Sequence, residues 1–193
     1  MARKPWPSVA LLALALAATG CAGKGNTGTS VDGSVTGDRG GPSITYFSAD
    51  HRSTAGDVRG TTLSGAPLAL SDYRGKYVVV NYWSATCGPC HAEQPGFEQA
   101  AKDFAAKGVR FVGIDEDDNL ASARTYARHY RMTYPTLMDQ SRSFLLDFPG
   151  AVPSVTPYTI VIDPSGGIAA ASANTLDYTH LIGLLHHVMS EPT

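Results

Sequence analysis

The chain has 193 residues, of which 43% are hydrophobic, enough for one domain with a substantial core. Its formal net charge is −2, so it lacks the basic balance that nucleic-acid binding requires. No internal repeat is visible, and only 17% of the residues are charged. We therefore expect one globular unit that binds no nucleic acid.

The start of the chain has the pattern of an export signal. Two basic residues precede an apolar run over residues 9–18, which is too short to span a bilayer as a helix. The run ends in Ala-Thr-Gly-Cys, which resembles a bacterial lipobox, although Ala18 stands where leucine is usual. This resemblance implies a signal peptide over residues 1–20 and attachment of a diacylglyceryl group to Cys21. The alternative is an ordinary secretory signal with an incidental cysteine. In either case the mature protein works outside the cytoplasm.

The next segment, residues 22–43, consists mainly of Gly, Ser, Thr and Asp. Such a segment buries too little apolar surface to offset the entropy lost when it becomes ordered. We expect a flexible tether over residues 21–43, which begins at the lipidated Cys21, and a globular domain over residues 44–193.

Apolar periodicity predicts alternating strands and helices in this domain. In chain order the expected elements are a hairpin over residues 61–70, a strand over 77–82, a helix that Gly108 ends, a strand over 109–114, a helix over about 120–130, a short strand over 134–138, a strand over 158–162, a turn into 168–172 and a last helix from about Asp177. This order is typical of an α/β domain with a mixed sheet.

Two side-chain groups within this pattern have simpler interpretations than a functional site. The acidic run over residues 115–118 could form a cation site, but after a strand it is more simply a solvated loop. Trp83, Phe97 and Phe104 are expected in the core.

Cys87 and Cys90 lie between the strand 77–82 and the helix that follows it. Such a pair can be a redox dithiol, half of a zinc site or a structural disulfide. A zinc site needs four ligands and no second cysteine pair exists, so we expect no metal. A structural disulfide that closes so short a loop would stabilise the fold little. A helix N-terminus favours the thiolate, so we predict a redox dithiol in which Cys87 attacks and Cys90 resolves.

The stretch VVVNYWSATCGPCHAEQPGFE resembles the thioredoxin superfamily, and most closely its extracytoplasmic TlpA/ResA-like branch. The matching residues are Asn81, Tyr82, Trp83, Cys87, Gly88, Pro89, Cys90, Glu93 and Pro95. The resemblance covers roughly residues 58–190. It implies a thioredoxin-like fold with a central mixed sheet flanked by helices, an N-terminal hairpin and a helix–strand insertion between the second and fourth strands.

A second matching stretch is VTPYTIVIDPSG, which contains Thr156 and Pro157. In this family the residue at Pro157 is a cis-proline beside the disulfide; the alternative is an ordinary trans-proline at the start of a strand. A cis X–Pro bond turns the chain sharply and leaves the Thr156 backbone free to pair with a substrate polypeptide. We therefore expect substrate contacts at Thr86, Gly88, Pro89, Thr156 and Pro157.

Two positions depart from familiar members of the superfamily. Thr86 stands where a tryptophan is frequent, which reduces the apolar surface beside Cys87 and leaves substrate preference open. Asn81 replaces the buried aspartate of cytoplasmic thioredoxins, and an amide cannot accept a proton. The resemblance implies that Glu93 instead removes the proton of the resolving thiol. The alternative is that Glu93 is an exposed glutamate favoured by the helix dipole. We interpret His91 as a surface residue.

The leading hypothesis is a membrane-tethered thiol–disulfide oxidoreductase that needs no cofactor. It would be anchored through Cys21 to the outer face of the bacterial cytoplasmic membrane and re-reduced by a membrane electron donor. The Gly-Pro spacer is that of thioredoxin, a reductant with a reduction potential of about −270 mV. This spacer favours reduction of protein disulfides over their formation. The branch resemblance implies apocytochrome c as one substrate and cytochrome c biogenesis as one role; general disulfide reduction fits equally well.

Two other functions on the same fold remain as alternatives. A peroxiredoxin-like thiol peroxidase would carry Thr-x-x-Cys, whereas Thr86 directly precedes Cys87. A non-catalytic copper carrier would typically have its cysteines three residues apart together with a distant histidine, which this spacing does not provide.

Overall fold

The computed structural model describes residues 34–37, 41–116 and 118–191. The expected signal peptide and the lipidation site Cys21 lie outside these residues. In the described part of the chain, no helix has both the length and the apolar character that a membrane span needs.

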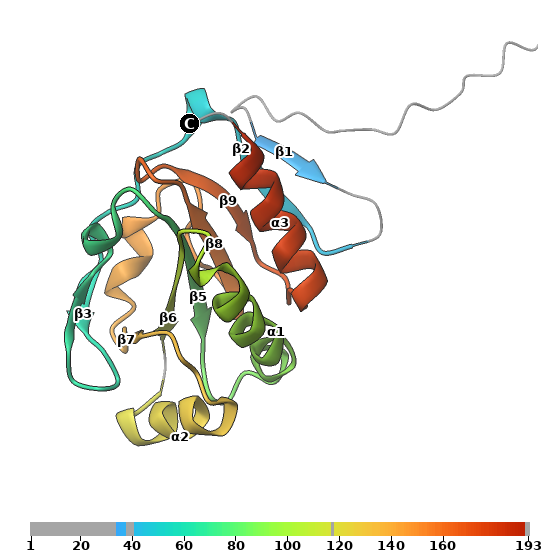
Figure 1. Cartoon of the computed structure of the whole chain (residues 1–193). Helices are drawn as coiled ribbons and strands as arrows, with labels where there is room; N and C mark the ends of the chain where they lie inside the picture. The colour runs from blue at the N-terminus through green and yellow to red at the C-terminus, as the bar shows by residue number, and fades with distance from the viewer. Residues whose placement is uncertain (1–33, 38–40, 117, 192–193) are drawn as a thin grey trace, which may run out of the picture.

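The fold is a mixed sheet flanked by helices, as expected (Figure 1). The strands are β1 (Ser34–Gly37), β2 (Ile44–Phe47), β3 (Arg59–Thr61), β4 (Pro67–Ala69), β5 (Tyr77–Trp83), β6 (Val109–Asp115), β7 (Thr136–Met138), β8 (Tyr158–Ile162) and β9 (Ile168–Ser172). The α-helices are α1 (Gly88–Ala105), α2 (Leu120–Tyr130) and α3 (Tyr178–Ser190), and short 3-10 helices cover Ala49–His51, Leu70–Tyr73 and Ser143–Asp147.

Seven strands form the main sheet in the order β1-β2-β9-β8-β5-β6-β7. The neighbours β5, β6 and β7 are parallel, and β8 pairs antiparallel with both β5 and β9. The predicted hairpin is confirmed as the antiparallel pair β3–β4, and α2 with β7 forms the predicted helix–strand insertion.

The expected tether differs from the structure at its end, because residues 34–37 form β1 and pair antiparallel with β2. Backbone N–H and C=O groups make such an edge pairing, so it needs no run of apolar side chains. The ordered unit therefore begins before Ile44.

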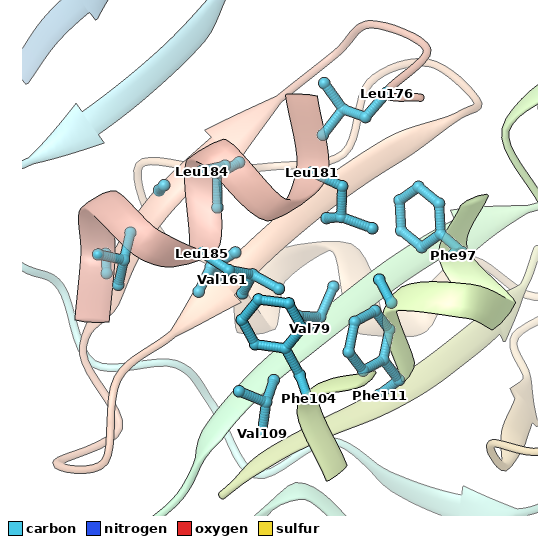
Figure 2. Packing of buried hydrophobic residues seen from close by; sticks show 14 of the residues in the cluster. Val79, Phe97, Phe104, Val109, Phe111, Val161, Leu176, Leu181, Leu184 and Leu185 are labelled. Atoms are coloured by element: carbon cyan, nitrogen blue, oxygen red, sulfur yellow. The ribbon is translucent and has the colours of Figure 1, made fainter. Parts of the chain in front are cut away.

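The core has two layers, one on each face of the sheet. Successive residues of a strand point to opposite faces, so Val79 joins one cluster while Val78 and Val80 join the other. The first cluster lies between the sheet and helices α1 and α3, where Phe97 and Phe104 contact the leucines of α3 (Figure 2). The expectation that Trp83, Phe97 and Phe104 are buried is confirmed.

Local signals fix where the helices begin and end. The Asp177 side chain caps α3 by accepting a hydrogen bond from the His180 N–H at 2.9 Å, and the Asn119 side chain caps α2 in the same way. Gly108 has φ +81°, a left-handed conformation that favours glycine, and it follows the end of α1 as predicted. Helices α1 and α2 begin shortly after the C-terminal ends of β5 and β6.

Candidate active site

The two cysteines form a disulfide at the point where β5 passes into α1. Cys87 is the N-cap residue of α1, and its sulfur accepts a hydrogen bond from the Cys90 N–H at 3.1 Å. Cys87 is half-buried, whereas Cys90 is completely buried. A sulfur at a helix N-terminus faces unpaired N–H groups and the positive end of the helix dipole, which stabilise a thiolate.

Glu93 lies one turn beyond Cys90, and it is buried rather than exposed. One carboxyl oxygen accepts from the Asn81 side-chain amide at 2.9 Å, and the other accepts from the Leu176 N–H at 3.0 Å. Burial raises the pKa of Glu93 to about 7, although both hydrogen bonds act in the opposite direction. A carboxyl group with this pKa exchanges protons near neutral pH.

The Thr156–Pro157 peptide bond is cis, as the family resemblance implies. Tyr158 pairs with Tyr82 in the sheet, so this segment lies just beyond the end of the β5–β8 ladder, on the side where β5 leads to Cys87. The Thr156 hydroxyl donates to the Glu116 carboxylate, which also lies 3.5 Å from the Arg142 guanidinium.

The other predicted substrate-contact residues lie on the active-site loop and the first turn of α1. Thr86, Gly88 and Pro89 are exposed, and the Thr86 hydroxyl is 3.2 Å from the Ser84 hydroxyl. Together with Cys87 they form the accessible rim of the disulfide.

The acidic run after β6 is not the solvated loop that the sequence favoured. Asp115, Glu116 and Asp118 are all buried. Asp118 accepts a hydrogen bond from the Ala85 N–H of the active-site loop, and Glu116 accepts from Thr156. The run therefore links two loops of the site, and backbone or hydroxyl donors compensate its burial.

His91 is exposed, as expected, but its ring is fixed. Nδ1 lies 2.7 Å from the Tyr130 hydroxyl and Nε2 lies 2.9 Å from the Ala85 carbonyl oxygen. Tyr126 completes this wall: its hydroxyl donates to the Cys90 carbonyl at 2.9 Å, and its ring stacks on Trp83 at 4.2 Å. Helix α2 thus packs directly against the redox centre, which periodicity alone could not indicate.

The site can carry out disulfide exchange with its own side chains. It combines an accessible sulfur at a helix N-terminus, a buried partner sulfur and a buried carboxyl group that titrates near pH 7. Among the residues that the structure describes, no group of three or more His, Cys, Asp or Glu side chains is arranged to hold a metal ion.

Residues 52–171 match the model of the AhpC/TSA family. Curated relatives include two thiol-disulfide oxidoreductases ResA. That of Geobacillus kaustophilus is 30% identical over 125 residues, which cover 64% of this chain and 70% of the relative. That of Bacillus cereus is 26% identical over 127 residues, which cover 64% and 72%.

Solved structures with the same fold include a DsbF homologue from Corynebacterium diphtheriae, with a TM-score of 0.70, 26% identity, and coverage of 78% of this chain and 96% of that one. A thiol:disulfide interchange protein from Chlorobium tepidum has a TM-score of 0.66 and 25% identity, and covers 72% of this chain and 97% of its own. The family match, residues 52–171, includes Cys87, Cys90 and the Thr156–Pro157 segment.

Proposed function

This chain belongs to the AhpC/TSA family and is a ResA-related thiol–disulfide oxidoreductase, and on that basis we propose that it reduces protein disulfides outside the cytoplasm. The observation that carries the proposal is the half-exposed Cys87 sulfur, which caps α1 and is bonded to the buried Cys90. The Cys-Gly-Pro-Cys spacer, shared with a strongly reducing protein, supports reduction as the direction.

The reaction begins with the reduced dithiol. The Cys87 thiolate attacks one sulfur of the substrate disulfide, and the other substrate sulfur leaves as a thiolate and takes up a proton. Cys90 then loses its proton and attacks the Cys87 sulfur, which forms the Cys87–Cys90 disulfide and releases the second substrate sulfur as a thiol. Two electrons pass from the protein to the substrate, the Cys90 thiol supplies one proton, and the solvent, which took up the proton of the Cys87 thiol, supplies the other.

We propose that Glu93 accepts the proton that Cys90 loses in this step. Both side chains are buried and lie three positions apart on α1, on the same side of the helix. A pKa of about 7 lets the Glu93 carboxyl group accept a proton in one half of the cycle and return it in the other. Asn81 and Leu176 hold the carboxyl group in place through their hydrogen bonds.

The substrate polypeptide lies, in this proposal, across the exposed rim of Thr86, Gly88 and Pro89. Its backbone pairs with that of Thr156, which lies outside the β8 ladder. Glu116 supports the arrangement by binding the Thr156 hydroxyl, and the neighbouring Pro157 is buried.

The leader pattern supports an extracytoplasmic, lipid-anchored protein, with a signal peptide over residues 1–20 and a tether that runs from Cys21 to the sheet. A membrane-bound dithiol protein would restore the reduced state. Candidate substrates are the oxidised haem-binding cysteines of apocytochrome c and other disulfides of exported proteins.

A trapping experiment tests the assignment of the two sulfurs. In the Cys90→Ser variant the mixed disulfide cannot be resolved, so a covalent complex between Cys87 and a disulfide peptide should accumulate and be visible by mass spectrometry. The Cys87→Ser variant should form none, because its remaining sulfur is buried. A complex that forms through Cys90 instead would reverse the two roles.

The reduction potential tests whether the protein reduces disulfides or forms them. Equilibration of the protein with dithiothreitol or glutathione buffers should give a value near that of thioredoxin, about −270 mV. A reduction potential of about −120 mV would indicate that the protein forms disulfides instead.

A further inference from the structure

Helix α2 has a cationic surface that the proposed reaction does not use. Arg124, Arg128 and Arg131 are exposed, and the segment 120–131 contains no acidic residue. Among the described residues, no carboxylate pairs with any of these three arginines; Arg59 and Lys102 have carboxylate partners, whereas the exposed Arg74 and Lys107, far apart in the sequence, have none. These three guanidinium groups lie within one short segment without a carboxylate partner, although Arg124 Nε donates to the Leu63 carbonyl oxygen at 2.8 Å, and they form a local positive surface in a chain whose net charge is −2.

Two hollows flank this helix. The three arginines line one of about 400 Å³ together with Leu63, Ser64, Ala127 and Met132. The other has a volume of about 490 Å³, and it is lined by Ala85 and His91, which flank the Cys87–Cys90 segment in the sequence. Arg128 connects the two, because its guanidinium donates to the hydroxyl of Thr125, which lines the second hollow, at 2.9 Å.

The hollow lined by Ala85 and His91 has fixed walls. Both ring nitrogens of His91 are engaged, and the Tyr126 hydroxyl is bound to the Cys90 carbonyl. The faces of Tyr126 and Tyr130 that line it therefore offer rigid apolar area, with little side-chain entropy left to lose when a polypeptide binds.

We propose that the α2 surface binds an acidic segment of the protein substrate, next to the disulfide that Cys87 attacks. The segment crosses the hollow beside His91 and places its carboxylates on Arg124, Arg128 and Arg131. The charges are complementary, and guanidinium groups bind carboxylates through paired hydrogen bonds. This inference rests on the proposed reduction of protein disulfides and names the kind of substrate that is preferred.

The test compares two disulfide peptides that differ only in a flanking segment of three glutamates or three glutamines. The rate constant for oxidation of the reduced protein is measured by stopped-flow fluorescence. We expect the acidic peptide to react about tenfold faster at low ionic strength, and the two to converge in about 0.5 M salt. The Arg124→Gln/Arg128→Gln variant should lose most of the preference, and Arg128→Gln alone part of it.

Lys107→Gln is the matched control, because it removes one exposed positive charge near the far end of α1. It should keep the full preference for the acidic peptide. Reaction with a small uncharged aromatic disulfide, 4,4'-dithiodipyridine, reports on the dithiol alone and should be nearly equal in all variants.

The outcomes separate the two proposals. If the reduced protein fails to reduce either peptide, the proposed function is wrong. If it reduces both peptides at the same rate, or if the glutamine variants keep the preference, only the acidic docking site is wrong. Arginine-dependent binding to phosphatidylglycerol vesicles, or an arginine-dependent dimer, without any peptide preference would assign the surface to another occupant and overturn the inference.

Discussion

The environment of Glu93 sets the pH range in which the stability of the oxidised protein should change. Its pKa of about 7 in the folded protein lies above the ordinary value of 4.5, so the folded state holds this proton more tightly than the unfolded state. The contribution is fully present below about pH 4.5 and is lost as the pH rises through about 7. We expect the free energy of unfolding to fall by up to roughly 3 kcal/mol across this range.

Urea denaturation of the oxidised protein at several pH values measures the slope of the free energy of unfolding against pH. The Glu93→Gln variant should have a flatter profile, because glutamine does not titrate in this range. An unchanged slope in Glu93→Gln would assign the pH dependence to another group.

The sequence identified Cys87, Cys90 and Glu93 as chemically important, but it could not give their surroundings. The Leu176 N–H that donates to Glu93 lies 83 residues further along the chain. The acidic run was interpreted as solvated because its partners, Ala85 and Thr156, are distant in sequence. Local patterns indicate chemical type, whereas burial depends on contacts that only the folded chain creates.

Elements were easier to predict than their packing. Apolar periodicity gave the core strands, the three α-helices and the stop at Gly108 closely, because each signal lies within one short segment. The edge strand β1 was missed, since its pairing with β2 is made by the backbone. The docking of α2 on the redox centre was also missed, because it depends on contacts such as that of His91 with Tyr130.

The approach of α1 to the start of α3 can be tested with two glycines. A Cβ added at Gly96 would lie 2.8 Å from the backbone nitrogen of Tyr178, so the helices would have to separate. We expect Gly96→Ala to lower the free energy of unfolding by about 1–3 kcal/mol, despite the better helix propensity of alanine. Chemical denaturation with the disulfide intact measures the change.

Gly183→Ala is the matched control in α3, because a Cβ at Gly183 meets no atom within 4 Å. This variant should gain up to about 1 kcal/mol, since alanine favours helix and restricts the unfolded chain. If both substitutions stabilised the protein, α1 and α3 would not be in the close contact described here.

At the scale of the whole molecule, one side chain joins the two ends of the described domain. Arg52, in the segment after β2, donates to the Phe47 carbonyl at 3.1 Å and lies 3.0 Å from Asp163 in the β8–β9 turn. It also pairs with Glu191, just beyond α3. The rings of Tyr46 and His187 are in contact nearby, with centroids 4.2 Å apart and planes tilted by 56°, so the end of α3 is held beside β2 (Figure 1). Nothing in the sequence indicates that Arg52 pairs with Asp163 and Glu191, because these partners lie 111 and 139 residues away.

Breaking this junction should destabilise the whole fold. The Arg52 and Asp163 side chains are only 5% and 6% exposed, so removing the cation leaves a buried carboxylate without its countercharge. We expect Arg52→Met to cost about 3 kcal/mol in the free energy of unfolding, measured by urea denaturation. Arg59→Met, which removes an arginine that is 71% exposed and paired with Asp57, should cost less than about 1 kcal/mol. The Arg52→Met/Asp163→Asn double variant should lose less than the sum of its single changes, because it leaves no uncompensated charge at position 163. Equal losses from Arg52→Met and Arg59→Met would mean that the buried pair contributes no more than a surface one.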